Sequence, residues 1–447
     1  MKVQRCGYLA KIREIVNKLS VLSMNLFITI IIWVAYVISV YFSIFLLLVY
    51  FDKKSIFQKE RSSLDLPQHP LVSILIPAYN EENTIIRTME SVYNLEYPKE
   101  KMEVIVIDDG SQDTTKQKIQ EYIKDKPQFR LLSHQNQGKA ASLNRALARV
   151  KGEFFACLDA DSFVDPSTLT KMLALYYKEN DPQLAIITPA MKVYQPQNVL
   201  QKIQWLEYLV IILIARISSQ MDTLYVAPGP FSLYRTSVIR KVGGFDEKNI
   251  TEDQEIAYRM QKYHYRIKHC FDGYVYTTAP KDLKPFYRQR RRWYLGSMIC
   301  LHQYKEIIGN RHYGDFGIIQ MAKNVMGYFL ALSGITLAAY FLFIPLGRWT
   351  KSLLLLKLDY LPLLLQIRFR FDKMTLLLAD FKKGYIVAFL FLISLFFFYK
   401  AHRNANEKIN RFGWIPIIPY FAFYYLLKGI ILLLSLVEFS KSKRIKW

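Results

Sequence analysis

The chain has 447 residues, of which 52% are apolar, so it can hold two or three domains with a sizeable core and is not a disordered sequence. Lysine and arginine exceed aspartate and glutamate by 60 to 37. A surplus of this size is typical of nucleic-acid binders, membrane-surface proteins and enzymes for anionic substrates. The four cysteines lie far apart, which argues against a disulfide framework and against a structural zinc site.

The first long apolar run covers residues 25–51 and contains no charged residue. It exceeds the roughly 20 residues that cross a bilayer, lacks a small-residue cleavage site and is too long for a signal-peptide core. We therefore expect residues 1–51 to hold a retained transmembrane helix. Residues 52–69 are charged, contain Pro67 and are followed by Pro70, which is typical of a linker.

Between about residues 70 and 300, short apolar runs alternate with polar segments of helix length. The runs are 71–77, 103–109, 129–133 and 153–159. This alternation predicts an α/β domain with a parallel sheet covered on both faces, in which ligands bind beyond the carboxyl ends of the strands. Polar sequences follow each run at that edge: PAYNEE, DDGSQD, NQGK and DAD.

Asp159 and Asp161 are the acids in this set best suited to a metal ion. Alternate positions of an extended segment point the same way, so both carboxylates can converge on Mg²⁺ or Mn²⁺ shared with a diphosphate. Asp109 also fits an ordinary strand-to-helix turn with a helix cap. Lys139 follows Gly138 at a helix start, where its charge suits a phosphate, and a solvated lysine explains that position equally well.

The segment 203–220 is too apolar for an ordinary surface helix and is interrupted by Glu207 and Arg216. We expect an amphipathic helix that seats the domain on the membrane, with a buried core helix as the alternative. The next segment, APGPFSLYR at 227–235, is expected to form a loop that lines an acceptor site.

Two later motifs carry chemistry. Asp253 lies in an acidic group at the start of a helical segment, where it can act as a general base or can favour the helix N-terminus. The stretch YRQRRRWYLGS at 287–297 places four arginines beside Trp293. Guanidinium groups can stabilise a departing diphosphate and an indole can stack on a sugar, whereas basic residues can also extend toward acidic lipid.

Further apolar runs cover residues 325–346, 385–399 and 414–438. Charged residues interrupt the segment 353–378, which is better suited to a helix in the membrane interface. Residues 301–447 are therefore expected to form interfacial and transmembrane helices, with four or five crossings in the whole chain.

Six motifs in order resemble the processive family-2 glycosyltransferases, the group that contains cellulose, hyaluronan and poly-N-acetylglucosamine synthases. They are PAYNEE, VIDDGSQDTT, NQGKAASLN, LDADS, GGFDEKNITEDQEIAYRM and QRRRW, and they span about residues 70–300. The resemblance implies a GT-A fold between membrane helices and Mg²⁺- or Mn²⁺-dependent, inverting transfer from a UDP-sugar to a growing polysaccharide. It also implies a multi-pass protein of the cell membrane with a cytoplasmic catalytic domain. One crossing before that domain would place the basic first twenty residues outside, against the positive-inside tendency.

By position, the resemblance implies a role for each of nine residues. The uridine would be bound by Asp109, helped by Tyr79 and Glu81; the metal pair would be Asp159 and Asp161, with Asp161 closer to the metal; the base would be Asp253; and the QxxRW residues would be Gln289, Arg292 and Trp293. Lys139, at its helix start, is the further candidate for binding the substrate. Thr251 and Glu252 precede the base in a form that cellulose and poly-N-acetylglucosamine synthases share and that hyaluronan synthases usually lack. This resemblance favours a poly-N-acetylglucosamine synthase, with UDP-N-acetylglucosamine as the donor, and does not establish the donor sugar.

Two other functions remain open from the sequence. A non-processive membrane glycosyltransferase that adds a sugar to a lipid would share the fold, the metal and the base. A non-enzymatic basic scaffold for lipid would not need acids at successive strand ends. The partners implied are a UDP-sugar, a polysaccharide acceptor, the bilayer and a small accessory membrane subunit, without nucleic acid.

Overall fold

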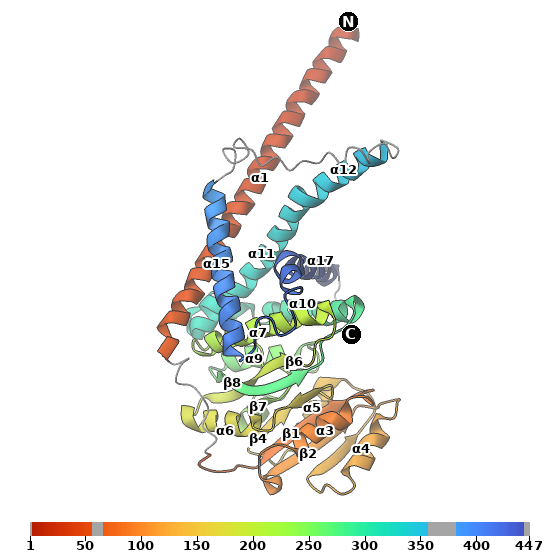
Figure 1. Cartoon of the computed structure of the whole chain (residues 1–447), viewed down its shortest axis with the longest axis vertical. Coiled ribbons are helices and arrows are strands. Elements are labelled where there is room, and N and C mark those ends of the chain that lie inside the picture. The colour runs from red at the N-terminus through yellow and green to blue at the C-terminus, as the bar shows by residue number, and fades with distance from the viewer. Residues whose placement is uncertain (1, 56–65, 356–380, 442–447) are drawn as a thin grey trace. The chain divides into compact units, whose positions relative to one another are not determined.

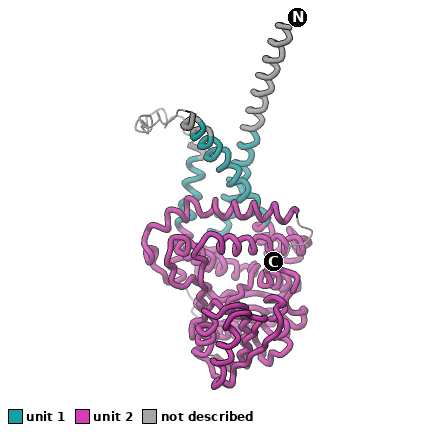
Figure 2. The backbone as a smooth tube through the Cα atoms, turned by 90° about the vertical axis from the view of Figure 1, so that its right-hand side faces the viewer, with its two compact units in different colours: residues 1–48, 325–395 teal, residues 49–324, 396–447 magenta. Residues whose placement is uncertain are grey.

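The computed structural model describes residues 2–55, 66–355 and 381–441. It divides into two compact units, coloured differently in Figure 2. The first consists of residues 1–48 and 325–395, and the second of residues 49–324 and 396–447.

The first unit is helical. It contains most of α1 (Lys2–Asp52) and α11 (Ala322–Ala338), together with α12 (Ile344–Leu355) and the first part of α15 (Phe381–Asn404). Large apolar side chains on these helices are exposed, among them Leu26, Val37 and Leu346. Such surfaces are stable in water only when something covers them, and lipid is the usual cover for helices of this length.

Four helices among the described residues are long and apolar enough to cross a membrane. They cover Leu26–Asp52, Phe316–Gly347, Gly384–Asn404 and Ile417–Lys441. Each corresponds to one of the four predicted apolar runs. The runs 325–346 and 385–399 lie wholly inside their helices, whereas the runs 25–51 and 414–438 begin shortly before theirs. The segment 353–378, predicted to lie in the membrane interface, falls almost entirely outside the described residues.

The second unit is built on an eight-stranded sheet with the order β3-β2-β1-β4-β7-β6-β8-β5. Its strands are β1 (Val72–Ala78), β2 (Met102–Asp108), β3 (Phe129–Ser133), β4 (Phe154–Cys157), β5 (Ser162–Val164), β6 (Leu184–Val193), β7 (Ser232–Arg235) and β8 (Arg266–Thr277). The four predicted strands are β1 to β4, and they pair in parallel. The expectation of a wholly parallel sheet is wrong, because β7 runs antiparallel to β4 and β6, and β5 runs antiparallel to β8.

Both faces of the sheet are buried, as β1 shows. Ile74 and Ile76 belong to the core on one face with Met89 of α3 (Ile85–Tyr93), whereas Leu75 belongs to the core on the other face with Leu143 of α5 (Lys139–Leu147). This division follows from the alternation of side chains along a strand. Figure 1 shows α3, α4 (Thr115–Ile123) and α5 beside β1 and β2. The other helices used below are α6 (Thr168–Glu179), α9 (Glu252–Lys262), α10 (Leu283–Gln303) and α17 (Tyr425–Lys441).

The predicted interfacial helix is α7 (Val199–Ser219), and the core-helix alternative describes it better. Most of its side chains are buried, including Trp205, and it packs against β6 and β8. The two charges that interrupt its apolar sequence, Glu207 and Arg216, are buried as well: Glu207 pairs with Arg290, and Arg216 bonds to Asn404. The charges interrupt an apolar sequence because they have partners inside the protein, not because they face water.

Candidate active site

Asp109 fastens two loops at the carboxyl edge of the sheet. Its backbone N–H donates to Ala78 at the end of β1, at 2.9 Å. Its carboxylate accepts the backbone N–H groups of Gln137 and Gly138, each at 2.9 Å, and lies 3.3 Å from His134 Nδ1. This buried carboxylate therefore shapes the loop that leads into Lys139, and its contact with uridine stays a prediction.

Tyr79 and Glu81 lie on the turn that follows β1. Tyr79 is exposed, with 43% of its side chain accessible. The Glu81 carboxylate accepts from Thr84 Oγ1 at 2.7 Å. Burial raises the pKa of Glu81, as do the carboxylates of Asp159 and Asp113, so this turn lies close to the metal pair predicted at the end of β4.

Lys139 joins three elements at the centre of the site. Its Nζ lies 2.6 Å from Asp159 Oδ1, after β4, and 2.8 Å from Glu252 Oε1, at the start of α9. Burial opposes its charge, but Asp159, Glu252 and Asp253 raise its pKa well above the ordinary value. The sequence did not single out Glu252 as a site residue, although its place in the acidic group at 252–255 was visible.

Gly229 makes this close packing feasible. A Cβ at position 229 would lie 2.7 Å from Lys139 Nζ and 2.9 Å from Asp159 Oδ2. Real Cβ atoms do not approach other atoms so closely, so any larger residue would displace the lysine or the aspartate. The prediction of a loop over 227–235 is wrong for its second half, because Ser232–Arg235 pairs with β4 and β6 as strand β7. The part before β7 contains Gly229 and lies directly against the Lys139–Asp159 pair.

Asp161 fits the role of a metal ligand. Ser162 Oγ donates to its Oδ1 at 3.0 Å, and burial and the neighbouring Asp159 raise its pKa. The described residues contain no cluster of three or more His, Cys, Asp or Glu that could hold a metal ion by themselves. Two carboxylates with open coordination positions suit a cation whose remaining ligands are water and diphosphate oxygens. A nearby cation favours the charged form of a carboxylate whose pKa is raised in this way.

Asp253 has the environment that a general base needs. Burial and Glu252 raise its pKa, while Lys139 and Arg292 lower it. A carboxylate whose pKa is raised toward neutrality in this way can accept a proton at physiological pH. Its backbone carbonyl accepts from Ala227 N–H at 3.1 Å, which ties Asp253 to the segment that precedes β7.

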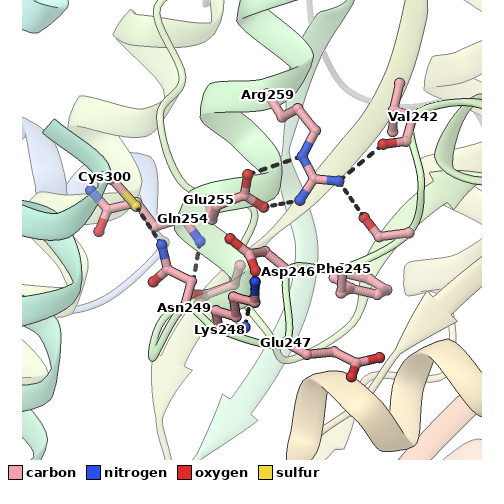
Figure 3. A network of polar contacts seen from close by, with 12 residues as sticks. Val242, Phe245, Asp246, Glu247, Lys248, Asn249, Gln254, Glu255, Arg259 and Cys300 are labelled. Carbon is pink, nitrogen blue, oxygen red and sulfur yellow. Dashed lines mark hydrogen bonds and ion pairs between the residues drawn. The ribbon is translucent and has the colours of Figure 1, made fainter. Parts of the chain in front are cut away.

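A polar network fixes the start of α9, as Figure 3 shows. Glu255 is fully buried and pairs with Arg259 on the next turn, with Nε to Oε1 at 2.9 Å. Arg259 Nη1 donates to the carbonyls of Val242, at 3.1 Å, and Gly244, at 2.7 Å. Tyr304, directly after α10, also donates to Glu255. Glu252 and Asp253 thus begin a helix whose first turns are fastened on two sides.

The start of α9 also touches α10 without a gap. A Cβ at Gly296 would lie 2.8 Å from the Cβ of Thr251 and would overlap its Oγ1. Only glycine allows α10 to pass this close, and α10 carries the QRRRW sequence. The two late motifs are therefore packed against each other.

Two of the four arginines in that sequence are not available to an anion. Arg290 is buried and pairs with Glu207, with Nη2 to Oε2 at 2.6 Å. Arg291 pairs with Glu438 of α17, with Nε to Oε2 at 2.7 Å. The alternative that basic residues of this stretch extend toward lipid is not needed for these two, because each has a glutamate partner.

Each of the three QxxRW residues has different neighbours. Arg292 lies close enough to Asp253 to lower its pKa. The Trp293 ring is covered by the Arg290 guanidinium, 4.2 Å from the ring centroid. Gln289 Oε1 is buried without a hydrogen-bond partner. A buried amide oxygen of this kind is usually satisfied by a ligand or a water molecule.

Comparison with known proteins agrees with this geometry. Residues 73–243 match the model for the glycosyl transferase family 2, a range that includes Lys139, Asp159 and Asp161 and ends before Asp253. A poly-beta-1,6-N-acetyl-D-glucosamine synthase of Staphylococcus epidermidis is 33% identical over 227 residues, which cover 50% of this chain and 54% of that protein. The synthase of the same name from Staphylococcus aureus strain MSSA476 has the same identity and coverage. The match thus spans about half the length of these relatives.

Among solved structures, a mannosyltransferase from Pyrobaculum calidifontis, in complex with GDP-Man and Mn²⁺, matches with a TM-score of 0.52 and 19% identity. The match covers 74% of this chain and 93% of that one. At this identity the likeness concerns the fold. Together with the family match and the mixed sheet, it leads to one conclusion: the chain contains a glycosyltransferase family 2 domain with a GT-A fold.

Proposed function

We propose that the protein is a membrane-embedded, inverting glycosyltransferase that transfers N-acetylglucosamine from UDP-N-acetylglucosamine to a growing β-linked polysaccharide. The observation that carries this proposal is the meeting of Asp159 and Glu252 on one lysine, Lys139, at the carboxyl edge of the sheet. This contact brings the predicted metal pair and the predicted base into one site from motifs more than ninety residues apart. The poly-N-acetylglucosamine synthases at 33% identity support the choice of sugar.

The proposed chemistry assigns the base to Asp253. Its carboxylate takes the proton of the acceptor hydroxyl as that oxygen forms a bond to the anomeric carbon of the donor. The bond between this carbon and the diphosphate breaks, and UDP leaves with the electron pair. Arg292, close to Asp253, is placed to stabilise the charge that develops on the diphosphate.

The charges at the site support a role for a divalent cation. Two cations, Lys139 and Arg292, face five carboxylates, which belong to Glu81, Asp159, Asp161, Glu252 and Asp253. A diphosphate is an anion and would meet net repulsion there. Mg²⁺ or Mn²⁺ held by Asp159 and Asp161 would offset this repulsion and neutralise the leaving group.

The proposal extends to the membrane. The catalytic domain faces the cytosol, where nucleotide sugars are made, and the helices of a multi-pass protein carry the product across the bilayer. The four apolar helices support this arrangement. An aromatic acceptor platform at Trp293 would favour repeated additions to one chain.

Membranes that contain this chain alone provide the test. They are incubated with a panel of radiolabelled UDP-sugars, and UDP release and product length are measured with Mn²⁺ and with EDTA. We expect UDP release and polymer from UDP-N-acetylglucosamine, both lost in EDTA. No UDP release from any donor would contradict the proposal. A single-sugar product that extracts with lipid would instead support the non-processive alternative. UDP release that appears only with other membrane proteins would favour the predicted accessory subunit.

A further inference from the structure

A buried charge cluster connects α7, α10 and the last membrane helix, α17. Glu207 of α7 lies at its centre and is only 6% exposed. Its carboxylate accepts from Arg290 Nη2 at 2.6 Å, from Lys428 Nζ at 2.6 Å and from the Tyr424 hydroxyl at 2.6 Å. Tyr424 directly precedes α17, and Lys428 lies on its first turn.

Glu207 satisfies the conditions for a fixed buried acid. Burial alone would raise its pKa, but Arg290 and Lys428 hold it low, so the carboxylate stays ionised. Both oxygens accept hydrogen bonds, and Arg290 donates to each of them. Oε2 also accepts from Tyr424, and Oε1 also accepts from Lys428; the bond from Arg290 to Oε1 is the longest, at 3.3 Å. A bidentate arginine–carboxylate pair has a defined geometry, and removing one member of a buried pair leaves an uncompensated charge.

The same arginine covers the proposed acceptor platform. The Arg290 guanidinium lies 4.2 Å from the centroid of the Trp293 ring. An arginine stacked on one face of an indole fixes the tilt of that ring and leaves only the other face for a sugar. The position of Arg290 is set by Glu207, and the position of Glu207 is set partly by α17.

We propose that Glu207 is a positioning residue for the acceptor sugar, which holds Arg290 on the Trp293 ring and is itself held by Lys428 and Tyr424. It does not touch donor or acceptor. The last membrane helix thereby sets the orientation of the platform on which each new chain end rests. The proposal depends on the proposed function for the role of Trp293, but the contact between Arg290 and the indole can be tested without turnover.

The first measurement uses no activity. The chain has six tryptophans, so the full-length protein is labelled with 5-fluorotryptophan in detergent, and the Trp293 fluorine resonance is assigned by its loss in Trp293→Phe. Lys428→Met removes one partner of Glu207 and leaves the Arg290–Glu207 pair intact, so the protein should fold. We expect the Trp293 resonance to shift in Lys428→Met and Glu207→Gln and to return toward its wild-type position in Lys428→Arg.

The matched control is Glu438→Gln. It breaks the pair with Arg291, the residue after Arg290, and this pair also joins α10 to α17. The Trp293 resonance should not move in this variant. An unshifted resonance in Lys428→Met, or an equal shift in Glu438→Gln, would overturn the proposal even if the wild-type enzyme makes polymer.

The second measurement compares UDP release with product length in membranes. A misplacement of the acceptor by about 1 Å can lower the rate on the order of a hundredfold. The rate of elongation in Lys428→Met should therefore fall by as much as about a hundredfold, while donor hydrolysis persists. If Lys428 acts through Trp293, adding Lys428→Met to Trp293→Ala should shorten the product little further. Additive losses would contradict the positioning role. Absence of UDP release from the wild type would contradict the proposed function instead. The fluorine spectra would still show whether Glu207 and Lys428 set the position of the Trp293 ring.

Discussion

Asp253 is the residue on which the proposed chemistry depends most directly. Asp253→Asn keeps the size of the side chain but cannot accept a proton, so donor affinity should survive while transfer falls by roughly a hundredfold or more. The measurement is UDP release at saturating donor beside binding of labelled UDP-sugar. Equal loss of binding would assign Asp253 to the nucleotide or to the fold.

The pH dependence follows from the surroundings of the same carboxylate. Burial and Glu252 raise its pKa, so the basic form, which is the active one, is lost as pH falls through this raised value. The ratio kcat/KM should therefore fall on the acid side at a higher pH than an ordinary aspartate would give. Saturating Mn²⁺ keeps Asp161 ionised and isolates the titration of Asp253. The residual activity of Asp253→Asn should lack this acid limb; a limb that persists would point to another group.

Arg292 and Trp293 are neighbours in sequence, but substitutions at the two positions should impair different steps of the reaction. Arg292→Lys retains the charge and loses the planar two-pronged donor, so transfer should drop even at saturating donor. Trp293→Ala should shorten the polymer while donor hydrolysis continues, because it removes the platform and not the leaving-group contact. UDP release and polymer length are measured for both in the same membranes, and full-length polymer from Trp293→Ala would remove the case for a stacking platform.

At the scale of elements, the contact between α9 and α10 decides whether the base and the QxxRW residues share one site. Gly296→Ala would drive a methyl group into Thr251, one residue before Glu252. We expect a loss of transfer of on the order of tenfold or more, because the base shifts relative to the donor. Thr251→Ala removes most of the overlap and should restore part of the activity in the double variant. A fully active Gly296→Ala enzyme would show that the two helices can separate without cost.

The sequence predicts one half of the sheet better than the other, for physical reasons. β1 to β4 are apolar runs, each followed by polar residues, and this pattern is the one that parallel strands produce. β5 and β7 have only three and four residues, too few to show a period. β6 contains Pro189 beside a register shift, and proline ordinarily argues against an inner strand. Their placement depends on pairing between distant segments, which a local pattern does not contain.

The same limit applies to the site. Asp159, Asp161 and Asp253 were predicted from motifs, and the structure places them around Lys139. The partners of Arg290 and Arg291 could not be predicted, because Glu207 and Glu438 lie far away in the sequence and look like interruptions of apolar helices. A charge beside apolar residues has the same local sequence whether it meets water or a buried partner.

For the whole molecule, part of the charge is paired inside the fold. Arg290, Lys428 and Lys192 are among the cations that pair with glutamates in buried or partly buried places. Each pair removes one positive and one negative charge, so the positive surplus of the sequence is carried by the residues outside such pairs.

The apolar helices give a prediction at this scale. With four candidate spans among the described residues, washing membranes with alkaline carbonate should leave the protein in the pellet, whereas detergent should release it. The control is a peripheral protein of the same membranes, which carbonate removes. Release by carbonate would show that these helices do not cross the bilayer.

The interleaved order of the sheet has a consequence for synthesis on the ribosome. β4 pairs with β1 on one side and with β7 on the other, and the residue that precedes Asp253, Glu252, meets Lys139 only after β7 has joined the sheet. The nascent chain can thus form its first parallel strands, with Asp159 and Asp161 at their edge, well before the base leaves the exit tunnel. Pairings between distant segments form slowly, since the long intervening chain must first be ordered. A half-made chain therefore has the proposed metal pair without the proposed base, and under the proposed mechanism transfer cannot begin until the helix that begins at Glu252 has docked.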